Sequence, residues 1–139
     1  MSRRRIAVFG AGAWGTALAQ AFSASHEVVL WGRDRGQLEE IARIHENTRY
    51  LRGVRLRDTL AVEADFARAA AQAELHLVVT PLAGLRTTVR ELRRLAPGRA
   101  LLWACSSSTG TGVCRSNSAA RRLPKLVPSQ TKRLKRSIA

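Results

Sequence analysis

The sequence has few of the features that assign a protein to a membrane, a metal site or a disulfide framework. No apolar run approaches the ~20 residues of a membrane-spanning helix, and residues 3–5 precede a predicted strand rather than a signal-peptide core. We therefore expect a cytoplasmic protein with no membrane partner. Cys105 and Cys114 are separated by eight residues, without a second pair or a nearby histidine, so we predict free thiols and no metal site.

Histidine is also scarce, and its positions do not indicate a catalytic or metal-binding site. His26, His45 and His76 lack the spacing of metal ligands, and none has a paired carboxylate that the sequence identifies. Surface positions or hydrogen-bonded core positions are therefore favoured over catalysis.

Lysines and acidic residues are missing from different parts of the chain. Residues 1–105 hold 16 Arg, 10 Asp or Glu and no Lys, whereas residues 106–139 hold five Arg, three Lys and no acidic residue. The second part thus carries more than half of the net charge of +14. Because regular patterning also stops after Cys105, we predict a folded domain at residues 1–105 and a disordered basic tail at residues 106–139.

Predicted strands and helices alternate up to residue 105. The pattern predicts strands at residues 6–9, 27–31, 60–63, 75–80 and 100–105 and helices at residues 13–25, 37–46, 66–73 and 82–95. Asp65 is the expected N-cap of the third helix, and residues 47–56 are expected to be irregular. The first strand is an almost continuous apolar run, as in parallel strands covered on both faces. The alternation predicts an α/β fold with a Rossmann-type, doubly wound parallel sheet.

One stretch contains a binding motif. The strand at residues 6–9 leads into Gly10, Gly12 and Gly15, spaced as GxGxxG, and a helical pattern follows. In this context Gly10 permits a tight turn, Gly12 lets the main chain approach a phosphate, and Gly15 lets the helix lie close to the strand. The helix N-terminus offers N–H groups and a positive dipole end to an anion. We therefore predict a cradle for a dinucleotide pyrophosphate rather than an unspecialised glycine turn.

The end of the second strand selects the cofactor in such a site. An acidic residue about 20 positions after the glycines binds the adenosine ribose and repels the extra phosphate of NADP. Here Gly32 and Arg33 hold that place. Arg33 can bind a 2′-phosphate through its planar guanidinium, so NADP is expected to bind, while the adjacent Asp34 keeps NAD possible. The alternative is that Arg33 is a solvated turn residue.

Three further positions near the expected cofactor site need interpretation. Trp14 lies within the glycine motif, either at the mouth of the cofactor site or packed under the helix. Trp31 and Trp103 lie in strands and are expected to pack in the core. Thr80 and Pro81 end a strand at the carboxyl edge of the sheet, where ligands bind in open α/β folds, although Pro81 can also simply begin the next helix.

Several stretches share a pattern with one known family. Residues 10–19 read GAGAWGTALA, residues 27–34 read EVVLWGRD, and residues 47–54 read NTRYLRGV. Residues 77–81 read LVVTP, and residues 103–105 read WAC. With these stretches in this order, residues 1–105 resemble the N-terminal domain of bacterial NAD(P)-dependent glycerol-3-phosphate dehydrogenase. Arg52 stands where that family usually has a proline.

The resemblance implies an oxidoreductase that transfers hydride between dihydroxyacetone phosphate and sn-glycerol 3-phosphate for phospholipid synthesis. It places Ala13, Trp14 and Arg33 at contacts with NADPH. The complete predicted cofactor site comprises Gly10, Gly12, Ala13, Trp14, Gly15, Arg33 and Pro81.

The chain departs from the family pattern after Cys105. The family's last strand leads into a Lys-Gly pair whose lysine touches cofactor and substrate, and Ser106 stands at that place. A serine hydroxyl cannot supply the positive charge that a phosphate-bearing substrate calls for. The helical carboxy-terminal domain with the catalytic lysine has no counterpart. We therefore predict cofactor binding without a catalytic residue or turnover, and a truncation or frameshift near residue 106, with a genuine short protein as the alternative.

Two other functions stay open from the residues. Another hydroxyacid-type or ketopantoate-type reductase would share the glycine motif, but it should lack the patterns at residues 47–54 and 103–105. A nucleotide-sensing or nucleic-acid-binding module would use the basic tail, and its binding would weaken steeply with added salt. The tail has no aromatic residue between its charges, so stacking on single strands is unsupported.

Overall fold

A computed structural model describes residues 2–104, and the tail with Cys105 and Cys114 lies outside this range. The elements follow in the order β1 (Arg5–Phe9), α1 (Ala13–Phe22), β2 (Glu27–Trp31), α2 (Arg35–Ile44), β3 (Glu46–Asn47), β4 (Leu51–Arg55), β5 (Leu60–Val62), α3 (Phe66–Gln72), β6 (Leu75–Val78), α4 (Leu82–Leu95) and β7 (Ala100–Trp103). Within residues 2–104, no helix is long and apolar enough to cross a membrane.

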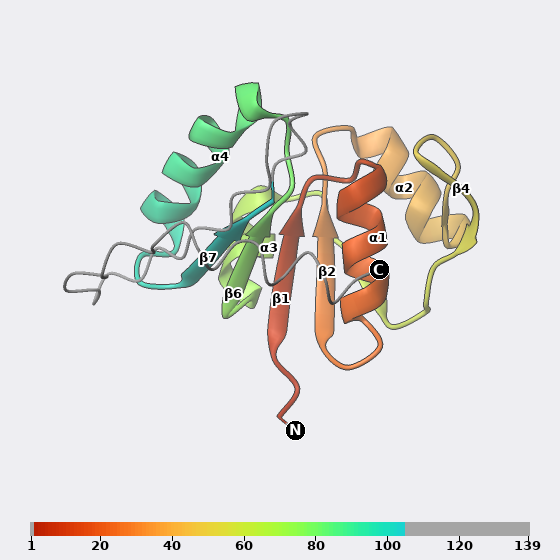
Figure 1. Ribbon diagram of the computed structural model, residues 1–139, viewed down its shortest axis with the longest axis horizontal. Coiled ribbons are helices and arrows are strands. Elements are labelled where there is room, and N and C mark those ends of the chain that lie inside the picture. Colours follow the sequence, from red (N-terminus) through yellow and green to blue (C-terminus); the bar gives the residue numbers. More distant parts are fainter. Residues whose placement is uncertain (1, 105–139) are drawn as a thin grey trace, which may run out of the picture.

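Five strands form one parallel sheet in the order β5-β2-β1-β6-β7. The central strand β1 pairs with β2 on one side and with β6 on the other (Figure 1). The chain therefore builds outward from β1 first in one direction and then in the other, and this creates a switch point at the carboxyl end of β1. Ligands of open α/β sheets bind at such a point. The predicted doubly wound sheet is confirmed.

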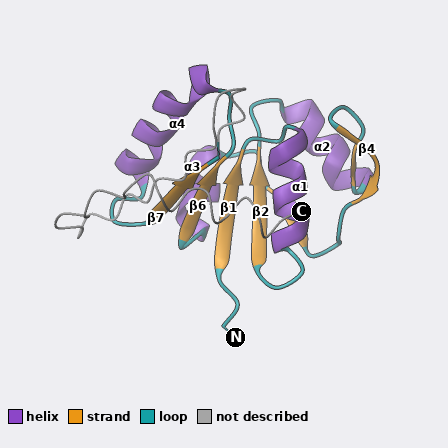
Figure 2. Ribbon diagram, in the orientation of Figure 1, coloured by secondary structure: helices purple, strands orange, loops and turns teal. Residues whose placement is uncertain are grey.

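The two faces of the sheet bury alternate residues, because successive side chains of a strand point to opposite sides. Ile6 and Val8 belong to a core under α1 and α2, whereas Ala7 and Phe9 belong to a core under α3 and α4. Figure 2 shows the helices on either side of the strands, with α1 in front and α3 behind. Covering both faces explains why β1 is apolar throughout its buried length.

Aspartate side chains cap two of the helices. The Asp34 carboxylate accepts a hydrogen bond from the Gln37 N–H at the start of α2, at 3.1 Å. Asp65 accepts from the Arg68 N–H at the start of α3, at 2.9 Å, which confirms the predicted N-cap. These caps fix the first turns of helices that follow strands β2 and β5.

The segment expected to be irregular contains a β-hairpin. Strands β3 and β4 pair antiparallel with an irregular register, and Gly53 has a φ of 79°. The prediction failed because β3 has two residues and β4 is largely exposed, so neither strand shows a hydrophobic alternation. At the end of α2, His45 Nδ1 lies 3.7 Å from Asp58 Oδ1, a carboxylate partner that the sequence did not indicate.

Aromatic side chains join β1, β2 and α3 below the carboxyl edge of the sheet. Phe9 lies 5.0 Å from Phe66 and 5.9 Å from Trp31 between ring centroids. The rings of Trp31 and Phe66 meet edge to face at 4.9 Å. Trp31 and Trp103 pack, as expected, against the core under α3 and α4, and both are partly buried.

His76 is a buried, hydrogen-bonded core residue on β6. Its ring is 1 % exposed, Nε2 lies 2.9 Å from the Ala70 carbonyl oxygen, and the ring meets Phe9 edge to face at 5.6 Å. Burial lowers the pKa of His76 below the usual 6.5, and Arg99 lowers it further, while the contact with Ala70 opposes these effects. The folded protein therefore holds this imidazole neutral under conditions where the unfolded chain would protonate it.

Lowering the pH is therefore expected to destabilise the fold through His76. Below about pH 6.5 the unfolded state binds more protons, so the free energy of unfolding falls by up to about 1.4 kcal/mol per pH unit until the folded pKa is reached. Urea unfolding at about pH 7.5 and about pH 5.5 measures this loss, which His76→Gln should reduce. His26→Gln is the control because His26 is only half-buried, whereas His76 is buried. An equal pH dependence in wild type and His76→Gln would contradict the assignment.

Candidate functional site

The loop between β1 and α1 and the first turn of α1 are packed so closely that two glycines of the motif have no room for a side chain. Gly10 has a φ of 129°, and a Cβ there would lie 2.1 Å from the Val79 carbonyl oxygen. A Cβ on Gly15 would lie 1.7 Å from the Gly10 carbonyl oxygen. These glycines allow the close approach of β1, α1 and the chain after β6.

Gly12, the middle glycine of the motif, has open space in front of it. Among residues 2–104, a Cβ built on Gly12 meets nothing within 4 Å, although the backbone conformation, with a φ of −78°, would accept a side chain. Gly12 precedes α1, whose first backbone bond runs from the Thr16 N–H to the Gly12 carbonyl at 3.0 Å. The N–H groups of Ala13, Trp14 and Gly15 therefore have no helical acceptor. Space and unpaired donors together suit an anion.

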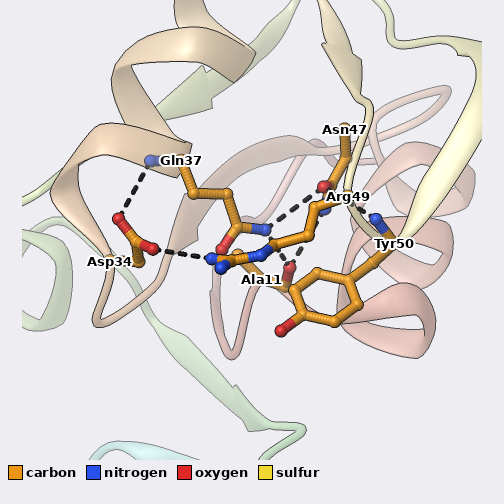
Figure 3. A network of polar contacts seen from close by, with 6 residues as sticks. All are labelled: Ala11, Asp34, Gln37, Asn47, Arg49 and Tyr50. Atoms are coloured by element: carbon orange, nitrogen blue, oxygen red, sulfur yellow. Dashed lines mark hydrogen bonds and ion pairs between the residues drawn. The ribbon is translucent and has the colours of Figure 1, made fainter.

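A buried amide holds this loop in place from the β-hairpin (Figure 3). The side chain of Asn47 is 1 % exposed, and its Nδ2 donates to the Ala11 carbonyl at 3.0 Å and to Thr16 Oγ1 at 2.8 Å. Its Oδ1 accepts from Gln37 Nε2 at 3.2 Å and from the Tyr50 N–H at 3.3 Å. Gln37 Nε2 also donates to the Ala11 carbonyl at 2.7 Å. The loop, α1, α2 and the hairpin are thus connected through one residue.

An ion pair links the turn after β2 to the same hairpin. Arg49 Nη1 donates to Asp34 Oδ2 at 2.7 Å, and Figure 3 shows the two side chains pointing toward one another. The Gln37 N–H and the Arg49 guanidinium hold the pKa of the Asp34 carboxyl below its usual range. Arg49 also lies over the Tyr50 ring, 5.9 Å from its centroid.

Two cavities share the carboxyl edge of the sheet. The first, of about 330 Å³, extends from Gly12 in the glycine loop to Arg49 in the hairpin, and the second, of about 470 Å³, lies between α3 and the first turns of α4. Both volumes suit a small organic ligand, for which about 300–1,000 Å³ is typical. Residues that line both cavities are Trp31, Arg33, Thr80 and Pro81. Thr80 Oγ1 is buried there without a hydrogen-bond partner in residues 2–104.

The predicted cofactor residues converge on this edge. Gly10, Gly12, Arg33 and Pro81 line the first cavity, and Ala13 and Trp14 form the exposed start of α1. Trp14 is 65 % exposed, so the alternative that it packs under the helix is wrong. Pro81 is the N-cap of α4 as well as a lining residue. Arg33 is exposed, and within residues 2–104 it forms none of the recorded ion pairs or side-chain hydrogen bonds.

Sequence reasoning missed the residues that connect the loop to the rest of the site. Asn47 belongs to the family pattern at residues 47–54, but the sequence does not indicate its contact with Ala11, which lies 36 residues earlier. Arg49 and Gln37 carried no separate signal. In the described range, no group of three or more His, Cys, Asp or Glu side chains could hold a metal ion.

A parallel sheet in this order, with the glycine loop at its switch point, defines a Rossmann-type dinucleotide-binding fold. Comparison with known proteins identifies one family within this class of fold. The model for the N-terminus of NAD-dependent glycerol-3-phosphate dehydrogenase matches residues 5–129, so the chain belongs to that family. The match extends past residue 105, and the domain boundary expected there stays a prediction. The family match decides against the other reductases that share the glycine motif.

Relatives and solved structures agree with this family. The chain is 62% identical to glycerol-3-phosphate dehydrogenase [NAD(P)+] of Aromatoleum aromaticum over 109 residues, which are 78% of this chain and 33% of that protein. It is 50% identical to the protein of the same name from Cupriavidus taiwanensis over 107 residues, which are 73% of this chain and 32% of that protein. The crystal structure of glycerol-3-phosphate dehydrogenase from Coxiella burnetii aligns with a TM-score of 0.67 at 26% identity, covering 74% of this chain and 32% of that one. The chain thus spans about a third of the length of these proteins.

Proposed function

We propose that this chain binds NADP or NAD and forms the cofactor-binding part of a glycerol-3-phosphate dehydrogenase. The observation that carries the proposal is that, within residues 2–104, the space in front of Gly12 is open beside N–H groups at the start of α1 that have no helical acceptor. Gly10 and Gly15 are packed against backbone and must be glycines, but no atom in the described part of the chain prevents a side chain at Gly12. A ligand that needs close approach to this backbone explains the absence of a side chain there.

The residues at the sheet edge fit the parts of a dinucleotide. The N–H groups of Ala13 and Trp14 would bind the pyrophosphate, and the Arg33 guanidinium would bind the adenosine end. The cavity between α3 and α4 combines the aromatic side chains Trp31 and Phe66 with polar side chains, among them the Thr80 hydroxyl, which has no hydrogen-bond partner within residues 2–104. The bound nicotinamide would supply or accept a hydride, and the chain's own residues would hold it in place and exclude water.

The reaction of the whole enzyme is part of the same proposal. We propose that a protein containing this domain interconverts dihydroxyacetone phosphate and sn-glycerol 3-phosphate in the cytoplasm, for phospholipid synthesis. The relatives' name, glycerol-3-phosphate dehydrogenase, and the 62% identity support this substrate pair. We further propose that the 139-residue chain alone binds cofactor without reducing dihydroxyacetone phosphate, because it spans only a third of those relatives. Measurable turnover by the purified chain would contradict this last point.

Gly12→Ala is expected to weaken dinucleotide binding strongly while leaving the fold intact. The added methyl would enter open space, and the exchange of glycine for alanine at the N-cap of α1 should lower the free energy of unfolding by no more than about 1 kcal/mol. The same methyl would hold the pyrophosphate away from the backbone, so the affinity for NADPH should fall by at least about tenfold. Titration of NADPH fluorescence measures the affinity, and urea unfolding measures the stability.

Gly36→Ala is the matched control for this experiment. Gly36 is also a glycine in the first turn of a helix, it does not line the first cavity, and a Cβ there meets only Asp34 Oδ1, at 3.4 Å. The control should bind NADPH as the wild type does. Wild-type protein that fails to bind either NADPH or NADH would overturn the proposed function, and so would equal binding by Gly12→Ala.

A further inference from the structure

Two arginines from separate elements line the cavity beside the glycine loop. Arg33 lies in the turn after β2, and Arg49 comes from the connection between β3 and β4. Asp34 is the third charged residue of this lining, and the lining as a whole carries a net charge of +1. The cavity therefore favours an anionic group at the end that lies next to the β2–α2 turn.

Each oxygen of the Asp34 carboxylate already accepts a hydrogen bond from the protein. Oδ1 accepts from the Gln37 N–H, which caps α2, and Oδ2 accepts from Arg49 Nη1. An acidic residue in this region selects NAD when its oxygens are free to accept the ribose hydroxyls. Here the carboxylate instead holds a guanidinium at the cavity, and its own charge is balanced by that cation.

The ion pair with Asp34 leaves the Arg49 guanidinium able to bind a second anion. The Arg49 and Asp34 side chains are 58% and 49% exposed, so their ion pair is weak and Arg49 can share its five donors with a second anion. Stacking over the Tyr50 ring keeps the guanidinium at the hairpin tip. Arg33, which has no recorded partner in residues 2–104, faces the same cavity.

We propose that Arg33 and Arg49 together bind the 2′-phosphate of NADP, and that Asp34 positions Arg49 for this contact. The inference rests on the proposed function and goes beyond it by assigning a preference for NADP over NAD to a residue of the hairpin. A planar guanidinium group can bind two oxygens of one phosphate through two parallel N–H···O hydrogen bonds. Two guanidinium groups from different elements would contact the phosphate from two sides. With NAD, Arg49 stays on Asp34, and neither arginine gains a ligand contact.

The test compares ligands that differ only in the 2′-phosphate. Calorimetry with 2′,5′-ADP and 5′-AMP, and fluorescence titration with NADPH and NADH, are carried out on the wild-type chain and on Arg49→Gln. We expect the wild type to prefer the 2′-phosphorylated ligand of each pair. Arg49→Gln should lose about tenfold in affinity for 2′,5′-ADP and NADPH, and it should bind 5′-AMP and NADH as the wild type does. Arg33→Gln should show the same selective loss.

Arg55→Gln is the matched control. Arg55 lies on the same hairpin and pairs with a carboxylate, Asp58, at 3.3 Å, but it does not line the cavity. It should leave all four affinities unchanged. The inference is overturned if the wild type binds both members of each pair equally, or if Arg49→Gln weakens both equally or neither. Failure of the wild type to bind any of the four ligands would instead overturn the proposed function itself.

Discussion

Gly15→Ala is expected to destabilise the domain by about 3 kcal/mol or more, enough to unfold a large share of the protein. The added Cβ would lie 1.7 Å from the Gly10 carbonyl oxygen and 2.9 Å from the carbonyl carbon. Both are backbone atoms of a loop that already touches Val79, so no side chain can turn away to make room. Helix α1 would have to move off β1 and open the core beneath it. Urea unfolding followed by circular dichroism measures the loss.

Gly84→Ala is the control that separates the steric clash at Gly15 from the general effect of alanine in a helix. Gly84 is the third residue of α4, as Gly15 is the third residue of α1. A Cβ on Gly84 meets only the Thr80 side chain, at 3.8 and 3.9 Å, which is ordinary contact. This variant should gain up to about 1 kcal/mol from helix propensity. If the two variants are equally stable, the close packing of α1 on the Gly10 carbonyl is not what requires a glycine.

The parts of the fold that depend on local stereochemistry could be predicted from the sequence. The strand β2 and the helix α4 have the predicted bounds, and Asp65 caps α3 as its position before an alanine-rich stretch suggested. The roles of Gly10 and Gly15 followed from spacing alone, because a strand, a tight turn and a helix in close contact leave few choices of residue. Local patterns determine these features, so one sequence is enough to find them.

Contacts between distant segments could not be predicted in the same way. The hairpin β3–β4 has too few buried residues to show a period, so its position over the glycine loop appears only in the structure. Asn47 then contacts Ala11, and Arg49 contacts Asp34 across 15 residues. A single amide or guanidinium in a basic segment has no sequence signal that identifies its partner. The cofactor loop was thus predicted, whereas the residues that hold it were not.

Asn47→Asp is expected to cost about 3 kcal/mol of stability at neutral pH and to weaken NADPH binding as well. The change keeps the shape of the side chain, but an ionised carboxylate cannot donate to the Ala11 carbonyl, which accepts from Nδ2 at 3.0 Å in the wild type. Two acceptors would then face each other at a site that is 1 % exposed. Because Ala11 lies between Gly10 and Gly12, displacement of its carbonyl would move the loop that we propose binds the pyrophosphate.

The pH dependence of this variant identifies the cause of the loss. Burial and the facing carbonyl raise the pKa of the introduced carboxyl, and the protonated acid can donate one hydrogen bond to Ala11. The stability difference between Asn47→Asp and wild type should therefore shrink as the pH falls from about 7.5 to about 5.5. The comparison is made with wild type at each pH, because His76 destabilises both proteins in acid. NADPH affinity should recover in parallel.

Thr48→Val provides the control on the adjacent residue. The Thr48 hydroxyl donates to Glu40 Oε1 at 2.8 Å, and within residues 2–104 it forms no hydrogen bond with the glycine loop. Its loss should cost about 1 kcal/mol at either pH and leave NADPH affinity unchanged. If Asn47→Asp is no less stable than Thr48→Val, or if its deficit stays constant with pH, the Asn47 amide does not hold the loop through its donors. A deficit that shrinks in acid, together with recovered affinity, ties the hairpin to the cofactor loop through this one hydrogen-bond donor.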